Sequence, residues 1–211
     1  MPRRALRRID ETLDYSRHLY MVKEQLEKPW DVSRYFEDPS APLEVEIGSG
    51  KGQFIHDAAL ANPDHNFIGT EIAHKYAAYC AARLIGAGVS NACMFSGDGL
   101  ALFREHLPEN SLAAVHVYFP DPWWKKRHRK RRVMQMELVR ACEKCLIPGG
   151  KLHFWTDVEE YFMTAMEMMA AESVLEGPFE PSVDETVWRT HFEKRTVVEG
   201  RPVFRSYFVK K

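Results

Sequence analysis

Short apolar segments rich in β-branched residues alternate with longer helix-like segments from residue 43 onward, and this order limits the possible folds more than any other feature. The segments that we expect to form strands are residues 43–47, 66–72, 92–96, 113–119 and 151–155. The segments that we expect to form helices are residues 53–61, 73–85, 100–106, 134–146 and 158–172. Because parallel strands need a crossover connection, which is usually a helix, this alternation predicts a parallel, doubly wound α/β sheet.

The C-terminal part of the chain departs from this rhythm. Residues 187–192 and 202–208 are both strand-like, and they predict a final antiparallel pair. The expected architecture is therefore one α/β domain over residues 43–211, with a mostly parallel seven-stranded sheet that includes this antiparallel C-terminal pair. Residues 1–42 predict a basic, partly helical N-terminal extension, in which we expect residues 3–8 to be mobile.

No segment of the sequence suggests export, a membrane span or a metal site. The apolar runs are shorter than the roughly 20 residues that cross a bilayer, and the first ten residues, MPRRALRRID, lack the apolar segment of a signal peptide. Cys142 and Cys145 form a C-x-x-C pair, but two ligands do not complete a tetrahedral zinc site, and the pair lies in an expected helix. We expect a cytoplasmic protein without a metal, in which these cysteines are reduced and packed.

The first expected strand runs into a glycine-rich turn, E-I-G-S-G-K-G, over residues 46–52. Glycines such as Gly48 and Gly50 allow a tight turn and let a ligand approach the backbone. The spacing differs from the G-x-G-x-x-G of phosphate-binding turns. Glu46 in front of the turn favours a ligand with a cationic end, such as the sulfonium or ammonium of S-adenosylmethionine. By itself the turn is weak evidence, because many nucleotide-binding domains contain one.

Two further carboxylates follow the next two expected strands. Glu71 lies at the end of the second strand, where it can accept hydrogen bonds from both hydroxyls of a ribose. Asp98 follows the third strand, in the string S-G-D-G, where its side chain can reach an adenine edge. Acidic residues at three successive strand ends indicate a nucleotide cofactor. S-adenosylmethionine fits them better than NAD, which is the rival interpretation.

The fourth expected strand leads into the string Y-F-P-D-P-W-W-K-K-R-H-R-K-R-R at residues 118–132. Asp121 stands between two prolines, which stiffen the backbone around its carboxylate. Trp123 and Trp124 offer flat faces on which a base can stack. Ligands of open α/β sheets bind beyond the carboxyl ends of the strands, so aromatic faces and cations at this place indicate a nucleic-acid site.

The charges of the chain are unevenly distributed, although the net charge is only −1. Residues 125–132 and the group Arg3, Arg4, Arg7 and Arg8 hold 11 of the 29 lysines and arginines, which leaves 18 basic against 30 acidic residues elsewhere. A local positive field on an acidic body steers a polyanion toward that field. The alternative is a charged, solvated surface with no ligand.

The string from Pro120 to Arg132 resembles the P-D-P-W-x-K-K-R-H-x-K-R-R signature of the bacterial tRNA (guanine-N7)-methyltransferases, the TrmB family. The glycine-rich turn, Glu71, F-W-T-D at residues 154–157 and T-H-F-E-K-R at residues 190–195 are also similar to motifs of that family, in the same order. Two places depart from its pattern. Trp124 stands where Pro or His is expected, and residues 196–199 lack the usual glycine.

The resemblance implies a class I, Rossmann-like enzyme that methylates N7 of a guanosine in tRNA with S-adenosylmethionine, at guanosine 46 of the variable loop. It matches Glu46, Glu71, Asp98 and Asp121 to cofactor-site acids, and Asp121 also to the catalytic residue. It matches Lys125, Asp157, Thr190, His191, Phe192 and Glu193 to positions that contact the tRNA. We expect the other cations of the tract to hold phosphates, namely Lys126, Arg127, Arg129, Lys130 and Arg131.

The chemistry of N7 limits what such an enzyme must do. The nitrogen already has a free lone pair, so the enzyme mainly aligns the reactants, and a carboxylate such as Asp121 or Asp157 stabilises the charge that grows on the purine. The alternatives are a class I methyltransferase that acts on another RNA and a non-catalytic tRNA-binding protein, which would not require the four acids. We expect tRNA as the partner, with no membrane and no obligatory protein partner, and a monomer or homodimer.

Overall fold

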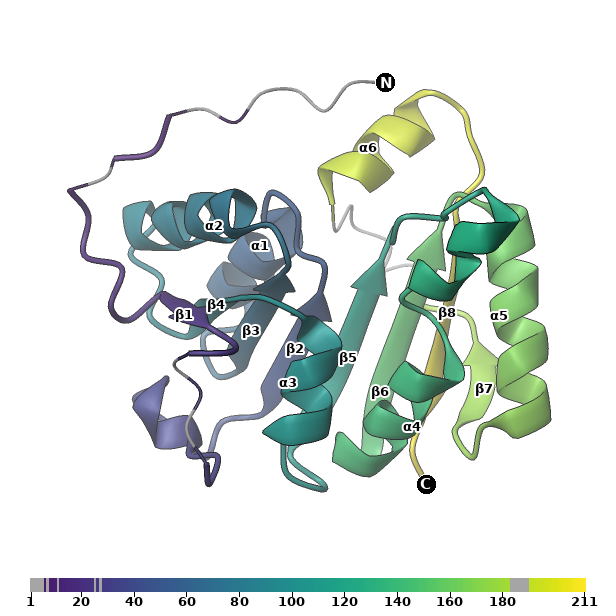
Figure 1. The fold of residues 1–211 in the computed structure, drawn as a ribbon, viewed down its shortest axis with the longest axis horizontal. Helices are drawn as coiled ribbons and strands as arrows, with labels where there is room; N and C mark the ends of the chain where they lie inside the picture. The colour runs from purple at the N-terminus through teal and green to yellow at the C-terminus, as the bar shows by residue number, and fades with distance from the viewer. Residues whose placement is uncertain (1–5, 7, 11, 25, 27, 183–189) are drawn as a thin grey trace.

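A computed structural model shows an α/β protein in which helices lie on both faces of one twisted sheet (Figure 1). The structure describes residues 6, 8–10, 12–24, 26, 28–182 and 190–211. The strands are β1 Leu19–Met21, β2 Leu43–Ile47, β3 Asn66–Glu71, β4 Ala92–Ser96, β5 Leu112–Tyr118, β6 Leu146–Thr156, β7 Glu176–Phe179 and β8 Phe204–Val209. The helices are α1 Gln53–Ala61, α2 His74–Gly86, α3 Gly99–Glu105, α4 Met136–Cys145, α5 Glu159–Glu172 and α6 His191–Val198, with 3-10 helices η1 Val32–Arg34 and η2 Lys126–Arg131.

The strand order in the sheet is β1-β4-β3-β2-β5-β6-β8-β7. Strands β1 to β6 pair in parallel, and β8 pairs antiparallel with both β6 and β7. The predicted mostly parallel α/β fold with an antiparallel C-terminal pair is therefore confirmed. Because β3, β2 and β5 are neighbours and run in the same direction, the loops that follow them meet at one edge of the sheet.

The sheet has eight strands in place of the expected seven, because residues 19–21 of the N-terminal segment form an additional edge strand. This strand pairs with β4, and backbone hydrogen bonds flank it, from Met94 to the His18 carbonyl (2.8 Å) and from Val22 to the Ser96 carbonyl (3.0 Å). Three residues are too few to show an alternation of apolar and polar positions, so the sequence carried no signal for it. The division of the chain at residue 42 stays a prediction.

The expected strand over residues 187–192 is wrong at its C-terminal end, where His191 and Phe192 begin helix α6. Thr190 caps this helix, because its side chain accepts a hydrogen bond from the Glu193 amide at 2.9 Å. The partner of β8 is instead β7, which precedes this region. Residues 187–189 lie outside the described residues, as do Arg3, Arg4 and Arg7, on which the expectation of a mobile terminus rests.

Two apolar layers hold the helices against the sheet. Helices α3, α4 and α5 cover one face, where side chains such as Val115, Phe154 and Leu138 form the larger cluster (Figure 1). Helices α1 and α2 cover the other face over β3 and β4, through Ile55, Phe67 and other buried residues. The thiols of Cys142 and Cys145 are buried in the first of these clusters, so the C-x-x-C pair is part of the core as predicted.

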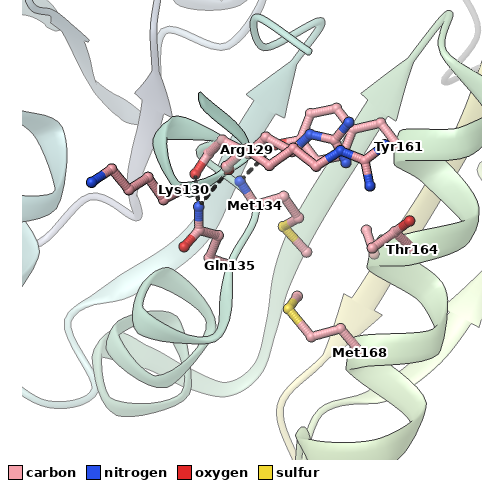
Figure 2. Close-up of a pocket in the computed structure, with 9 residues that line it drawn as sticks. Arg129, Lys130, Met134, Gln135, Tyr161, Thr164 and Met168 are labelled. Atoms are coloured by element: carbon pink, nitrogen blue, oxygen red, sulfur yellow. Dashed lines mark hydrogen bonds between the residues drawn. The ribbon is translucent and has the colours of Figure 1, made fainter. Parts of the chain in front are cut away.

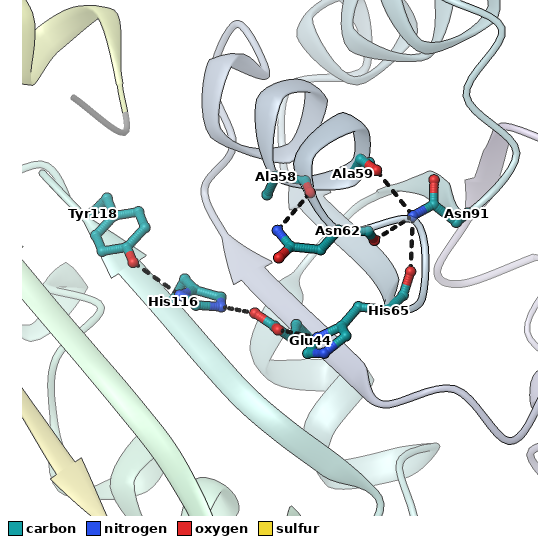
Figure 3. A network of polar contacts seen from close by, with 8 residues as sticks. All are labelled: Glu44, Ala58, Ala59, Asn62, His65, Asn91, His116 and Tyr118. Atoms are coloured by element: carbon teal, nitrogen blue, oxygen red, sulfur yellow. Dashed lines mark hydrogen bonds and ion pairs between the residues drawn. The ribbon is translucent and has the colours of Figure 1, made fainter. Parts of the chain in front are cut away.

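A chain of polar side chains crosses the face of the sheet that α1 covers (Figure 3). Glu44 on β2 lies between two histidine rings, 2.6 Å from His116 Nε2 and 2.7 Å from His65 Nδ1. The other ring nitrogen of His116 lies 2.9 Å from the hydroxyl of Tyr118, the last residue of β5. The network therefore supports the strand end from which the Asp121 loop departs.

We expect Glu44→Gln to lower stability at neutral pH and to weaken the dependence of stability on acid. Burial alone would raise the pKa of Glu44, but the hydrogen bonds and charges of His116 and His65 outweigh burial and lower the pKa to about 2. Because the folded pKa lies below the unfolded one, the contribution is present above the unfolded value and is lost as the pH falls toward 2. It amounts to about 3 kcal/mol at most.

Urea unfolding at pH 7 and at pH 3 checks this prediction. The control is Glu167→Gln, which removes an exposed carboxylate of α5. The wild type and the control should lose stability between the two pH values, whereas Glu44→Gln should lose less. Equal losses in all three proteins would contradict the assigned role of Glu44.

Candidate active site

The glycine-rich turn after β2 has a conformation that requires glycine. Gly48 and Gly50 have φ angles of 79° and 55°, in the left-handed region that side chains disfavour. The amides of Gly48 and Ser49 both donate to the carbonyl of Thr70 on β3, at 2.9 Å, and so fix the turn to the neighbouring strand. A side chain added at Gly48 would meet no atom within 4 Å, which shows that space is open beside the turn.

Glu71 joins the turn to the end of β3. Its carboxylate accepts hydrogen bonds from the amides of Gly50 (3.0 Å) and Ala73 (2.9 Å). An ionised carboxylate offers about four acceptor positions, so two remain for the hydroxyls of a ribose. The structure therefore brings Glu71 to the glycine-rich turn, as its predicted role at a nucleotide requires.

Glu46 lies beneath the turn and is 3% exposed. Burial raises the pKa of its carboxyl to about 7; the nearby Ser49 opposes the shift and the charge of Glu71 adds to it. Among the described residues, Glu46 Oε2 and Ser49 Oγ have no hydrogen-bond partner. Buried polar atoms without partners are costly, and they indicate a ligand that supplies donors. The ammonium group of S-adenosylmethionine is such a donor, so the residues present fit this cofactor.

Asp98 occupies the corresponding place after β4. It is exposed, and its carboxylate caps helix α3 by accepting a hydrogen bond from the Leu100 amide at 2.9 Å. The cap explains why a carboxylate is favourable at this position even without a ligand. The expected contact with an adenine stays a prediction for the remaining acceptor positions of the carboxylate.

Asp121 is exposed in the loop that follows β5, and the backbone around it is constrained. Phe119 and Trp123 on either side have φ angles of 49° and 44°, which are unfavourable for residues with side chains. Together with Pro120 and Pro122, these angles leave the loop few alternative conformations. The unfavourable backbone angles are therefore tolerated in a loop that holds one carboxylate at the carboxyl edge of the sheet.

Arg132 anchors this loop, although no site role was predicted for it. Its side chain is 5% exposed and forms an ion pair with Glu160 of α5 at 2.7 Å. The same guanidinium donates to the carbonyl of Pro122 at 2.8 Å and lies 4.5 Å from the ring centre of Tyr161. It thus connects the residue that follows Asp121 to helix α5. In the sequence Arg132 is the last cation of a run whose other cations are exposed, so nothing there indicated that it is buried.

The basic tract forms the short 3-10 helix η2. Repulsion between cations one turn apart disfavours a longer helix. The cations predicted to contact the tRNA are all exposed, namely Lys125, Lys126, Arg127, Arg129, Lys130 and Arg131. The guanidinium of Arg131 lies 5.0 Å from the ring centre of Trp123, and Trp124 is 67% exposed. Of the two tryptophans, Trp124 is the more accessible surface for a base.

Helix α6 lies beyond the carboxyl ends of β5 and β6 (Figure 1). The Phe192 ring packs 5.2 Å from that of Phe119, so the T-H-F-E-K-R block touches the loop that carries Asp121. Arg201, which follows helix α6, forms a salt bridge of 2.5 Å with Asp157. Asp157 therefore lies close to the end of this helix. The structure therefore brings Thr190, His191, Phe192 and Asp157 to the edge where Asp121 lies.

Glu193 differs from the other members of this block, because it is fully buried. Its carboxylate pairs with Arg205 of β8 at 2.9 Å, and that guanidinium lies 5.3 Å from the ring centre of Trp155. The contact of Glu193 with substrate stays a prediction. In the structure the Glu193 side chain connects α6 to the sheet through its ion pair with Arg205.

Comparison with known proteins shows the family of this chain. A protein-family model described as "Putative methyltransferase" matches residues 40–206. A tRNA (guanine-N(7)-)-methyltransferase of Rhodopirellula baltica is 42% identical over 221 residues, which cover 100% of this chain and 81% of that protein. The protein of the same name from Legionella pneumophila strain Lens is 34% identical, covering 99% of this chain and 94% of its own. The chain belongs to the TrmB family. It is accordingly an S-adenosylmethionine-dependent methyltransferase.

Solved structures with a similar fold are more distant in sequence. The 16S rRNA methyltransferase KamB matches with a TM-score of 0.63 at 16% identity, over 91% of this chain and 99% of that one. The tRNA (m1A58) methyltransferase TrmI from Aquifex aeolicus matches with a TM-score of 0.51 at 14% identity, over 81% of this chain and 62% of that one. At these identities the likeness shows the class I fold alone. No helix within the described ranges is long and apolar enough to span a membrane.

Proposed function

We propose that this chain transfers a methyl group from S-adenosylmethionine to N7 of guanosine 46 in the variable loop of tRNA. The observation that carries the proposal is the meeting of three loops at one edge of the sheet. The turn after β2, Glu71 at the end of β3 and the Asp121 loop after β5 follow neighbouring parallel strands. The relatives are named tRNA (guanine-N(7)-)-methyltransferases, which suggests tRNA as the substrate. The basic tract that continues the Asp121 loop suits a polyanion of this kind.

The acids of the chain have separate tasks in this reaction. Glu46 and Glu71 bind and orient the cofactor, which supplies an electrophilic methyl group on its sulfonium. The lone pair of guanine N7 forms the new bond to carbon as the bond from carbon to sulfur breaks, and no proton is removed. Positive charge thus moves onto the purine, and the Asp121 carboxylate stabilises it through space. Holding this carboxylate in a constrained loop avoids reorganisation during the reaction.

The exposed part of the loop suits an RNA in which one base is unstacked. N7 lies on the Hoogsteen edge of guanine, so the enzyme must reach a base that has left its tertiary contacts. Trp124 offers a stacking face beside Asp121, and the cations of η2 follow it directly. We propose that the purified chain carries out this reaction without a protein partner.

Transcripts of one tRNA that differ at a single nucleotide test the position. With guanosine at position 46 we expect stoichiometric methylation, and with adenosine there we expect a loss of at least 100-fold, because the other guanosines keep their N7 protected or out of reach. Primer extension after borohydride and aniline cleavage maps the product. Unchanged methylation of the adenosine-46 transcript would keep the reaction and refute the position.

A further inference from the structure

A cleft of about 300 Å³ lies between η2, the start of α4 and helix α5 (Figure 2). Its floor is apolar and consists of Met134, Tyr161, Ala165 and Met168, and the side chains of the two methionines point toward each other across it. Arg129 and Lys130 lie at its rim. None of the acids of the candidate active site lines this cleft, so the proposed chemistry leaves it without a role.

The walls of the cleft are fixed before any ligand binds. The Met134 amide donates to the hydroxyl of Tyr161 at 2.9 Å, which joins the segment after η2 to α5. The Gln135 side chain donates to the carbonyls of Arg129 (3.1 Å) and Arg132 (2.9 Å). A ligand would therefore meet a preformed surface and would not have to order these segments on binding.

The charge around the cleft is positive. Glu160 is the nearby carboxylate, and it is compensated by Arg129 at 3.2 Å and Arg132 at 2.7 Å. Lys130 is exposed, and no salt bridge to it is present among the residues that the structure describes. The cleft thus combines an apolar floor with a cationic rim, and it continues the tract that we expect to hold phosphates.

We propose that this cleft receives one unstacked nucleotide of the bound tRNA, separate from the guanosine that is methylated. Its base packs on the Met168 side chain, the accessible methionine of the floor, above the buried Met134, and its phosphate lies beside Lys130. This inference rests on the proposed function, because it takes tRNA as the ligand. A second unstacked nucleotide would hold the RNA in register while the target base is presented to Asp121.

Methionine methyl groups report directly on such an occupant. The chain has nine methionines, and labelling their methyl groups with 13C gives resonances that Met134→Leu and Met168→Leu assign. On addition of tRNA we expect the Met168 methyl signal to shift upfield, because a stacked base places it over its ring, and the signal of the neighbouring buried Met134 to shift by less. Signals of these two residues that stay unchanged in a saturated tRNA complex would overturn the inference.

Filling the cleft gives an independent kinetic test. Thr164 lines the cleft from α5 and is exposed, so Thr164→Trp occupies the space without disturbing the core. We expect KM for tRNA to rise on the order of tenfold, the size of one lost base-stacking contact, with an unchanged Kd for S-adenosylmethionine. The matched control is Met163→Trp, because Met163 is 50% exposed on the same helix and does not line the cleft.

Different results would refute the cleft proposal and the proposed function. If wild-type enzyme produces 7-methylguanosine in tRNA and Thr164→Trp has the KM of the wild type and of Met163→Trp, the cleft proposal is wrong and the function stands. If wild-type enzyme produces no 7-methylguanosine, the function itself is wrong, whatever the cleft variants show.

Discussion

Asp121→Asn should reduce kcat for tRNA methylation by about 10²- to 10³-fold, the range found when one electrostatic contact to a developing charge is removed. The substitution keeps the size of the side chain and its ability to accept hydrogen bonds, and it removes the negative charge. Because the constrained angles at Phe119 and Trp123 and the flanking prolines hold the loop, we expect the loop to keep its conformation. Single-turnover methylation at saturating cofactor and tRNA measures the effect.

The control for Asp121→Asn is Asp64→Asn, which removes a carboxylate from the loop before β3, at the opposite edge of the sheet. This control should have wild-type kcat. We expect the affinity of Asp121→Asn for tRNA to change much less than its turnover, because the basic tract supplies most of the attraction to phosphates. Full turnover with unchanged tRNA affinity in Asp121→Asn would contradict the assigned role of this carboxylate.

Arg132→Ala should lower kcat by at least tenfold and destabilise the protein by about 1–3 kcal/mol. The substitution removes the donor to the Pro122 carbonyl and leaves Glu160 with Arg129 alone. The loss of stability stays below the roughly 3–5 kcal/mol of a fully buried ion pair, because Glu160 is 42% exposed and solvated. The loss of turnover arises because the residue after Asp121 is no longer fixed to α5. Thermal unfolding and single-turnover rates measure the two effects.

Arg132→Lys separates positioning from simple loss of charge. A lysine keeps the positive charge near Glu160, but a single ammonium does not reproduce the planar fork that reaches both Pro122 and Glu160. We expect this variant to recover stability and to recover turnover only in part, with an unchanged Kd for S-adenosylmethionine. The same change at the exposed Arg129 should leave kcat unaltered. If kcat in Arg132→Ala follows the folded fraction alone, Arg132 has no positioning role.

Periodicity and composition predicted the elements that are long and buried. The bounds of β2, α1 and β4 agree with the expected residues, because each has an apolar pattern and ends at a glycine, a proline-containing turn or a polar residue. The glycine-rich turn and Glu71 were also predictable together, since the end of a buried strand has few possible neighbours in a parallel sheet. These local signals predict the place of the cofactor site.

The features that were missed depend on contacts that are distant in sequence or on competing local signals. The strand-like residues before Thr190 obscured the string T-H-F-E, which has the residue pattern of a capping box and predicts the start of α6. Arg132 and Glu193 look like ordinary surface charges in the sequence. Only the folded chain shows that they lie against Tyr161 and Arg205 and are almost completely buried. A buried charge requires its partner, and that partner is supplied by another element of the fold.

The most direct test of the account is to incubate the purified chain with methyl-labelled S-adenosylmethionine and bulk tRNA that lacks 7-methylguanosine, and then to digest the RNA and identify the labelled nucleoside. We expect the label to appear in 7-methylguanosine. Label in another nucleoside, or tight binding of tRNA without any transfer of label, would contradict it.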